Sequence, residues 1–423
     1  MHLGPHPQDF IWATGIEDTF VPQTRPGYRA LDEYELMGHY HHWREDLALA
    51  RELGVQALRW GVPWYRVEPE PGKFDWRWTD EVLPYLCQEL GITPIVDLMH
   101  YGCPFWLERE FANESYPEAV AAYAAAFARR YQSLVRWYTP LNEPLINALQ
   151  CGKRGVWPPY LRSQRGYVLL ILQLARGIQR TIAALKEIDP QAIIVHVEAT
   201  GLSRAEVPEL ESFVLDYEQE HYLSLDLLTG QVDTNHPRFS WLLRHGASRH
   251  DLADIARHPA RWDVLGLNFY PQWGTREFYL SQKGKLRYRL VEKEGSGFTS
   301  MIAAYHDRYG GPIMITETSA FRSQRARANW LDASLAAVKS LRHQGVPILG
   351  YTWFPLFTMI DWRYRLGKRP LEAYRIELGL YRLAEPEAPS RWRATPLAEK
   401  FRAYVQNPEK AIGTLRKAPF DIA

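Results

Sequence analysis

The pattern of apolar and polar positions along this chain switches repeatedly between two periods. Short apolar runs bounded by glycine, proline or charged residues predict buried strands, and stretches with apolar residues three or four positions apart predict helices. Residues 39–53 show the helical period well, because Trp43, Leu47 and Ala50 share one face. Gly54 follows directly, as is typical of a helix end.

Strands alternate with helices along the whole chain. The predicted strands are Asp9–Gly15, Val55–Trp60, Ile92–Leu98, Arg136–Leu141, Ala192–Glu198, Trp262–Asn268, Pro312–Thr316 and Val346–Trp353. This alternation predicts an α/β fold, a single (β/α)8 TIM barrel with long loops after the strands. No linker or repeat divides the sequence, so we expect residues 1–423 to form one domain, with residues 406–423 as a C-terminal tail.

Two stretches fit this pattern less well. Residues 205–261 predict one helix with several loops, and residues 276–297 predict an irregular, charged insertion before the seventh strand.

Two of the predicted strands lead directly to a glutamate. The segment Arg-Trp-Tyr-Thr-Pro-Leu-Asn-Glu-Pro at 136–144 starts with strand-forming aromatic residues, and its prolines cannot donate to a ladder. The strand therefore stops before Asn142 and Glu143. The apolar run at 312–316 leads in the same way to Glu317. Both glutamates should lie at the carboxyl-terminal rim of the barrel, where active sites of this fold occur.

Other strand ends are polar or aromatic as well: Glu17, Asp18, Arg59, His100, Asn268, Tyr270 and Trp353. Singly, each has an ordinary structural role open to it, such as a hydrogen-bonded core histidine for His100 or an ion pair for Arg59. Their common position at one rim favours a functional site.

Two rim glutamates suit the hydrolysis of a glycosidic bond with retention. That reaction needs one protonated carboxyl group and one ionised carboxylate, about 5–5.5 Å apart. Arg59 is the best candidate to keep the attacking carboxylate charged. Asn142, beside Glu143, is placed to donate to the sugar hydroxyl next to the reacting carbon.

These residues give the chain a resemblance to glycoside hydrolase family 1, the β-glucosidase family, over nearly its whole length. The similar segments are Phe10-Ile-Trp-Ala-Thr, Arg59-Trp-Gly, His100-Tyr, Thr139-Pro-Leu-Asn-Glu-Pro144, Asp263-Val-Leu-Gly-Leu-Asn-Phe-Tyr270 and Ile315-Thr-Glu317. The resemblance implies that Glu143 is the general acid/base and Glu317 the nucleophile. It further implies that Tyr270 bonds Glu317, that His100 and Asn142 hold sugar hydroxyls, and that Trp353 forms a stacking floor.

The chain departs from the family at residues that would contact the sugar. Glu17 and Asp18 stand in the opening motif, where the family has glutamine. Thr318 follows the nucleophile in place of asparagine. The run after Trp353 is one residue longer and ends in Asp361-Trp362, where the family has Glu-Trp. We expect catalysis to be retained, with Glu17, Asp361 and Trp362 in the sugar site, while the sugar preference stays open.

Three alternatives remain at this point. A transglycosidase would use the same covalent intermediate, and a non-catalytic carbohydrate-binding barrel would keep only the fold. The basic stretch from Arg363 to Arg369 raises a third, an anionic substrate such as a phosphorylated sugar.

The composition limits the classes of partner that the chain is expected to bind. A net charge of +1 gives no reason to expect nucleic acid or a membrane surface, and 16 Trp with 24 Tyr suit a cleft that stacks on sugars. The apolar run Val168–Leu174 is too short to span a bilayer. Three cysteines without metal-ligand spacing, and no secretion signal at the start, predict a cytoplasmic protein. We expect a small β-glycoside as partner and no cofactor or metal; the oligomeric state stays open.

Overall fold

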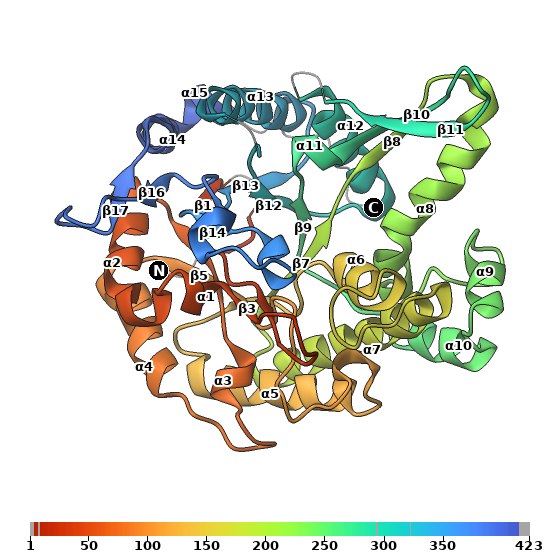
Figure 1. Cartoon of the computed structure of the whole chain (residues 1–423), viewed down its shortest axis with the longest axis horizontal. Helices are drawn as coiled ribbons and strands as arrows, with labels where there is room; N and C mark the ends of the chain where they lie inside the picture. Colours follow the sequence, from red (N-terminus) through yellow and green to blue (C-terminus); the bar gives the residue numbers. More distant parts are fainter. Residues whose placement is uncertain (1–3, 7–8, 293–294, 322, 414–423) are drawn as a thin grey trace.

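A computed structural model describes residues 4–6, 9–292, 295–321 and 323–413 of the chain. At its centre lies a closed barrel in the strand order β1-β13-β12-β9-β7-β6-β5-β4, with neighbouring strands parallel. The barrel strands are β1 (Ile11–Gly15), β4 (Ala57–Gly61), β5 (Thr93–Asp97), β6 (Trp137–Thr139), β7 (Ile193–Ala199), β9 (Val264–Asn268), β12 (Ile313–Thr318) and β13 (Ile348–Trp353). The predicted (β/α)8 barrel is confirmed, and each strand lies where the apolar runs placed it (Figure 1).

Helices surround the strands (Figure 1). The longer ones are α2 (His39–Leu53), α4 (Arg77–Pro84), α5 (Tyr116–Tyr131), α7 (Gln164–Ile188), α8 (Glu211–Leu228), α10 (Arg249–Arg257), α12 (Ser296–Tyr309), α13 (Gln324–His343) and α14 (Pro396–Gln406). Local signals set their ends. Pro117 lies in the first turn of α5, the Ser163 side chain accepts the Gly166 N–H at the start of α7, and Gly54 ends α2 in the left-handed region.

Short helices and strands lie in the segments between these longer elements. They are β2 (Phe20–Val21), β3 (Leu31–Asp32), α1 (Glu33–Leu36), α3 (Trp64–Val67), α6 (Pro144–Asn147), β8 (Leu202–Ala205), α9 (Phe239–Arg244), α11 (Pro271–Gly274), β10 (Thr275–Leu280), β11 (Leu286–Leu290), β14 (Met359–Ile360), β15 (Arg375–Ile376), β16 (Tyr381–Leu383), β17 (Trp392–Ala394) and α15 (Pro408–Ile412).

Two apolar layers make the barrel rigid. One fills its interior: Ile11, Ala13, Ala57, Ile95, Trp137, Ile193, Val195, Val197, Val264, Met314 and Leu349. The other packs between the strands and the surrounding helices. Burying a large apolar side chain contributes about 1.5–3 kcal/mol, so the many side chains of these layers hold the strand ends in fixed positions.

The apolar run at 168–174 belongs to α7, which is long and apolar enough to cross a membrane by length and composition alone. However, 72% of its most apolar stretch is buried inside the protein, and α7 packs against α5. Such burial is typical of a core helix.

Two stretches differ from the sequence-based expectation. Residues 276–297 were expected to be irregular, but β10 and β11 form an antiparallel hairpin there, and β10 also pairs with β8 (Figure 1). The expected C-terminal tail contains α15, which packs against α13 and α14, while residues 414–423 lie outside the described part.

Candidate active site

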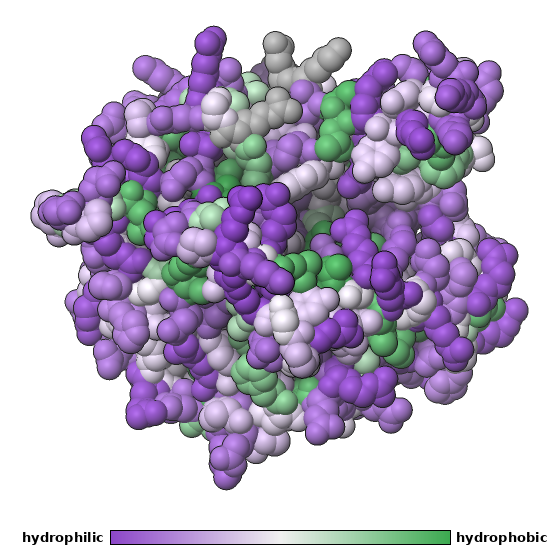
Figure 2. Space-filling view, in the orientation of Figure 1, coloured by the Kyte–Doolittle hydropathy of each residue, from purple (hydrophilic) through white to green (hydrophobic). Residues whose placement is uncertain are grey.

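A cavity of about 600 Å³ opens at the carboxyl ends of the barrel strands. Figure 2 shows a hollow near the middle of the viewed face, bordered in part by apolar side chains. Seven predicted site residues line the cavity: Glu17, His100, Glu143, Tyr270, Glu317, Asp361 and Trp362. Three more, Arg59, Asn142 and Asn268, are buried beside this group. Arg59 and Asn268 donate to carboxylates of the group, and Asn142 accepts from both Arg59 and Asn268.

Glu317, near the end of β12, is held by a cation and a hydroxyl. Arg59 Nη1 donates to Glu317 Oε1 at 2.6 Å, and the Tyr270 hydroxyl donates to Oε2 at 2.7 Å. The guanidinium is itself fixed from the other side, because Arg59 Nη2 donates to Asp97 Oδ2 at 2.6 Å. This carboxylate is therefore oriented by two donors and faces a buried positive charge.

Glu143 is held by neutral donors. It follows β6 and precedes α6, with φ of 47°, a left-handed conformation that non-glycine residues adopt mainly where the surroundings impose it. The Tyr101 hydroxyl donates to Oε2 at 2.5 Å, and Asn268 Nδ2 donates to Oε1 at 2.9 Å.

Asn142 links the two halves of the site. Its Oδ1 accepts from Arg59 Nη2 at 3.1 Å and from Asn268 Nδ2 at 3.2 Å. A hydrogen-bonded path thus runs from Arg59, which holds Glu317, to Asn268, which holds Glu143. Such a network fixes the separation of the two carboxyl groups, since neither can move without breaking buried hydrogen bonds.

Burial and charge set the protonation of this pair. Burial raises the pKa of both Glu143 and Glu317 above the ordinary value of a glutamate, and the two carboxylates also repel each other. The Arg59 charge acts against the rise at Glu317, with which it makes a direct ion pair. The direct ion pair thus favours the charged form of Glu317, whereas Glu143 accepts hydrogen bonds from neutral donors.

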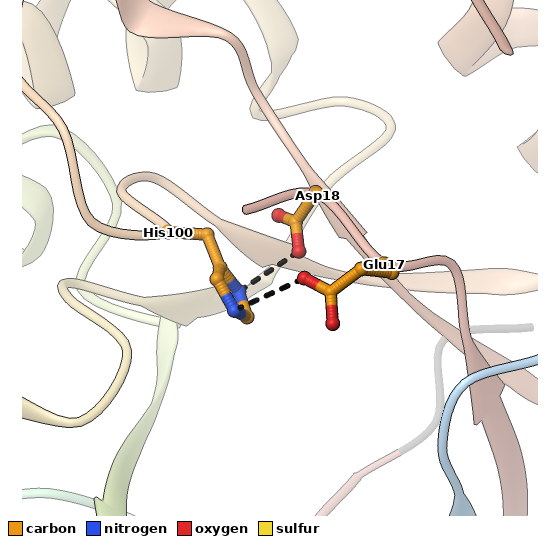
Figure 3. A group of neighbouring side chains, drawn as sticks. All are labelled: Glu17, Asp18 and His100. Atoms are coloured by element: carbon orange, nitrogen blue, oxygen red, sulfur yellow. Dashed lines mark ion pairs between the residues drawn. The ribbon is translucent and has the colours of Figure 1, made fainter. Parts of the chain in front are cut away.

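His100 lies among carboxylates. Its Nδ1 is 2.8 Å from Asp18 Oδ1 and 3.1 Å from Asp97 Oδ2, and its Nε2 is 3.8 Å from Glu17 Oε1. Figure 3 shows Glu17 and Asp18, consecutive residues after β1, both reaching the imidazole. Burial alone would lower the pKa of His100, but these carboxylates raise it well above its ordinary value. One carboxylate oxygen each from Glu17 and Asp18 and one ring nitrogen of His100 all lie within 4.8 Å of one another.

Trp353 does not occupy the expected place. It is 0% exposed, is absent from the cavity lining, and its indole N–H donates to the Leu378 carbonyl at 3.3 Å. Like Tyr351 two positions earlier, it belongs to the apolar layer between strands and helices. The next residue, Phe354, instead stacks parallel to His100, with ring centroids 6.3 Å apart. The prediction of Trp353 as a sugar-stacking floor is therefore wrong.

Part of the cavity wall is aromatic. Trp362 packs against Tyr101 and Trp157, with ring centroids 5.6 and 5.1 Å away. Trp273 and Phe321 line the cavity too, with centroids 4.6 Å apart. Flat apolar rings of this kind suit a sugar face or an aryl group.

The basic stretch after Trp362 is largely engaged within the protein. Arg363 pairs with Asp361, the residue expected to grip outer hydroxyls. Arg365 is buried and donates to the carbonyls of Arg29 and Pro22. These contacts weaken the case for a phosphate site built on this stretch.

Sequence reasoning missed two residues that touch the central network. Asp97 is the last residue of β5, so the strand-end rule that found Arg59 could have found it too. Tyr101 follows His100 directly, but nothing in the pattern showed that its hydroxyl would reach Glu143. Trp157 and Trp273 come from loops and a short helix whose approach to the cavity depends on tertiary packing.

Comparisons with known proteins agree with this geometry. Beta-glucosidase A of Thermotoga maritima is 22% identical over 361 residues, which span 78% of this chain and 80% of that protein. Thermostable beta-glucosidase B of Thermobispora bispora is 26% identical over 377 residues, spanning 78% and 75%. The structure of the Thermotoga maritima beta-glucosidase in complex with glucoimidazole matches 97% of this chain and 99% of its own with a TM-score of 0.81 at 19% identity, a likeness that shows the fold.

The family model described as glycosyl hydrolase family 1 matches residues 14–271, more than half of the chain. The matched part contains Arg59, His100, Asn142, Glu143 and Asn268. The chain belongs to glycosyl hydrolase family 1 and is a hydrolase of O-glycosyl bonds.

Proposed function

We propose that this chain is a retaining β-glycosidase in which Glu317 is the nucleophile and Glu143 the general acid/base. One observation carries the proposal. Glu317 makes a buried ion pair with Arg59, whereas Glu143, in the same cavity, accepts hydrogen bonds only from the neutral Tyr101 and Asn268 among its described contacts. One carboxyl group is thus kept charged for attack, and the other can carry a proton.

In the first step, Glu317 attacks the anomeric carbon while Glu143 gives its proton to the leaving oxygen. A covalent glycosyl–enzyme bond forms as the glycosidic bond breaks, and the aglycone leaves as an alcohol. Tyr270 and Arg59 keep Glu317 aimed at the reacting carbon. Glu143, now ionised, is stabilised by the hydroxyl of Tyr101.

In the second step, Glu143 takes a proton from a water molecule, whose oxygen attacks the same carbon and releases Glu317. Two inversions give net retention. Asn142 would donate to the hydroxyl beside the reacting carbon, and His100 to the next one along the ring. Trp362, half-buried at the cavity wall, would stack on the sugar or its aglycone.

The substrate is proposed to be a small β-glycoside. Solved structures of similar fold contain glucoimidazole or castanospermine, and the relatives are beta-glucosidases by name. Transfer to an alcohol or sugar in place of water would use the same intermediate. A purely binding barrel is disfavoured by the intact hydrogen-bonded path that leads from Glu317 through Arg59, Asn142 and Asn268 to Glu143. Cys87, Cys103 and Cys151 are free thiols, which suits a cytoplasmic location.

A panel of aryl β-glycosides, with the product anomer followed by NMR, tests this proposal. Glu317→Gln should abolish turnover, and Glu317→Gly should recover activity with an α-glycosyl fluoride. Glu143→Ala should slow poor leaving groups far more than good ones, because only the former need a proton. Glu218→Gln, at a buried carboxyl outside the cavity lining, is the matched control and should retain activity. An inverted product, or full activity of Glu317→Gln, would remove the assignment.

A further inference from the structure

Glu17 presents an unused oxygen to the cavity. The residue is 8% exposed and lines the cavity wall. Its Oε1 is fully engaged, since the Thr19 backbone N–H donates to it at 2.9 Å and the Thr19 hydroxyl at 2.5 Å. Within the described residues, no hydrogen bond reaches Oε2. In Figure 3 this second oxygen points away from the imidazole of His100.

Carboxyl groups also outnumber cations at the base of the cavity. Glu17, Asp18, Asp97 and Glu317 lie there against Arg59 and His100. Arg59 is shared between Asp97 and Glu317, and the Nδ1 of His100 between Asp18 and Asp97. No cation in the described part makes a close ion pair with Glu17, whose nearest is the His100 Nε2 at 3.8 Å. A buried carboxylate without a close cation is costly, so a ligand that brings a positive charge is favoured there.

We propose that the sugar bound in this site carries a positively charged amino group that Glu17 Oε2 accepts, so that the substrate is the β-glycoside of an amino sugar. This proposal rests on the proposed glycosidase function and names its substrate class. A neutral hydroxyl would donate the hydrogen bond but leave the carboxylate charge unbalanced. An ammonium group would donate the hydrogen bond and also balance the charge.

The order of contacts places the amino group away from the reacting carbon. His100 Nε2 lies 3.1 Å from Asn142 Nδ2 and 3.8 Å from Glu17 Oε1, so the contacts run in the order Asn142, His100, Glu17. If Asn142 faces the second ring carbon, Glu17 faces the third or fourth. An ammonium at the second carbon would meet Asn142, which offers it no charge.

A metal ion is a poorer occupant of the same place. Both ring nitrogens of His100 are engaged within the protein, Nδ1 with Asp18 and Asp97 and Nε2 with the amide nitrogen of Asn142, whereas a metal ligand needs a free ring nitrogen.

Two measurements at near-neutral pH test the proposal. The first compares kcat/KM of the wild type for aryl β-glycosides of glucose and of its 2-amino, 3-amino and 4-amino derivatives. We expect the 3-amino or 4-amino glycoside to exceed the glucoside by about tenfold to a hundredfold, the usual range for a hydrogen bond to a charged group. The 2-amino glycoside, of equal charge, should show no such gain.

The Glu17→Gln variant should reverse this order, because an amide keeps the acceptor but loses the charge. Glu218→Gln is the matched control: its carboxyl group is also buried but lies outside the cavity lining, so the ratio of amino to neutral glycoside should stay as in the wild type. Thermal melting checks that both variants fold.

The second measurement is calorimetric binding of the free amino sugars and of glucose, which needs no turnover. Tighter binding of an amino sugar, lost in Glu17→Gln, supports the proposal even if catalysis is absent. Equal binding of glucose and amino sugars, or an equal effect of Glu17→Gln on both, overturns it while leaving the glycosidase assignment to the stereochemical test. A preference that a chelator abolishes would also overturn it, in favour of a metal.

Discussion

The hydroxyl of Tyr101 should set the pH above which the enzyme loses activity. Tyr101 is 2% exposed, and its O–H donates to Glu143 at 2.5 Å. This hydrogen bond favours the ionised carboxylate and so lowers the pKa of Glu143 against the larger, opposing effect of burial. Tyr101→Phe removes one oxygen atom and leaves the ring in place, so the pKa of Glu143 should rise.

The size of the shift follows from the strength of the bond. A hydrogen bond to a charged group contributes about 1.5–3 kcal/mol, and about 1.4 kcal/mol corresponds to one pH unit. The predicted upward shift is therefore about one to two units. The proposed first step needs Glu143 to be protonated, so activity should be present below its pKa and lost as the pH rises through it. The variant should therefore remain active to higher pH.

The assay is the pH profile of kcat/KM with an aryl β-glycoside of a poor leaving group, whose alkaline limb reports the acid in the free enzyme. The leaving group of a dinitrophenyl glycoside needs little protonation, so the alkaline limb for this substrate should be the same in the wild type and in Tyr101→Phe. Tyr138→Phe, which removes a buried hydroxyl bonded to the Val135 carbonyl, controls for general effects of the substitution. An alkaline limb that is unchanged or moves to lower pH in Tyr101→Phe would refute the assignment of Glu143 as the proton donor.

Substitutions at other positions separate catalytic from structural roles. Arg59→Lys keeps a charge but cannot serve two carboxylates in a fork, so kcat/KM should fall about a hundredfold or more; unchanged kinetics would contradict its role. Trp353→Phe should destabilise the fold by about 1–3 kcal/mol, seen as a lower Tm, and leave KM unaltered. Trp362→Ala should raise KM, because Trp362 lines the cavity. The opposite pattern would restore Trp353 as a sugar contact. Burial raises the pKa of Glu198 to about 8, above its unfolded value, so ionisation in the unfolded chain makes the wild type less stable as pH rises from about 4.5 to about 8. Glu198→Gln should remove that loss, by an amount on the order of a few kcal/mol, so its Tm advantage should grow across this range; a pH-independent difference would contradict the buried, neutral state of this carboxyl group.

The barrel could be predicted from sequence because its strands are buried on both faces. Such strands are short continuous apolar runs, and the rule that parallel strands present their carboxyl ends at one face then gathers Arg59, Glu143 and Glu317 without any knowledge of loops. The hairpin of β10 and β11 escaped because it is stabilised by pairing with β8, some seventy residues earlier in the chain. A local signal did exist there: alternation in Leu286–Leu290 and a turn with Gly284 in the left-handed region.

Trp353 shows where a rule of position fails. The strand-end rule states that a residue lies near the rim but not which face of the strand it occupies, and a shift of one position turns a side chain from the centre to the helices. The pairing of β12 with β13 contains register irregularities, which no sequence pattern revealed. As a result the stacked ring beside His100 belongs to Phe354, one residue later.

Catalysis and sugar selection depend on different parts of the backbone in this protein. Arg59, Asn142 and Asn268, which hold Glu143 and Glu317, lie in or just after barrel strands and are linked to one another and to these carboxyl groups by hydrogen bonds. Glu17 and Asp361 sit on loops beyond the strands, and each is held by a neighbour two residues along the chain, Thr19 or Arg363. A change at either loop position should therefore alter what the cavity binds without disturbing the buried path between Glu143 and Glu317. This arrangement explains physically how the family's reaction can persist while the sugar contacts depart from the family pattern, and why the amino-sugar preference should respond to Glu17 alone.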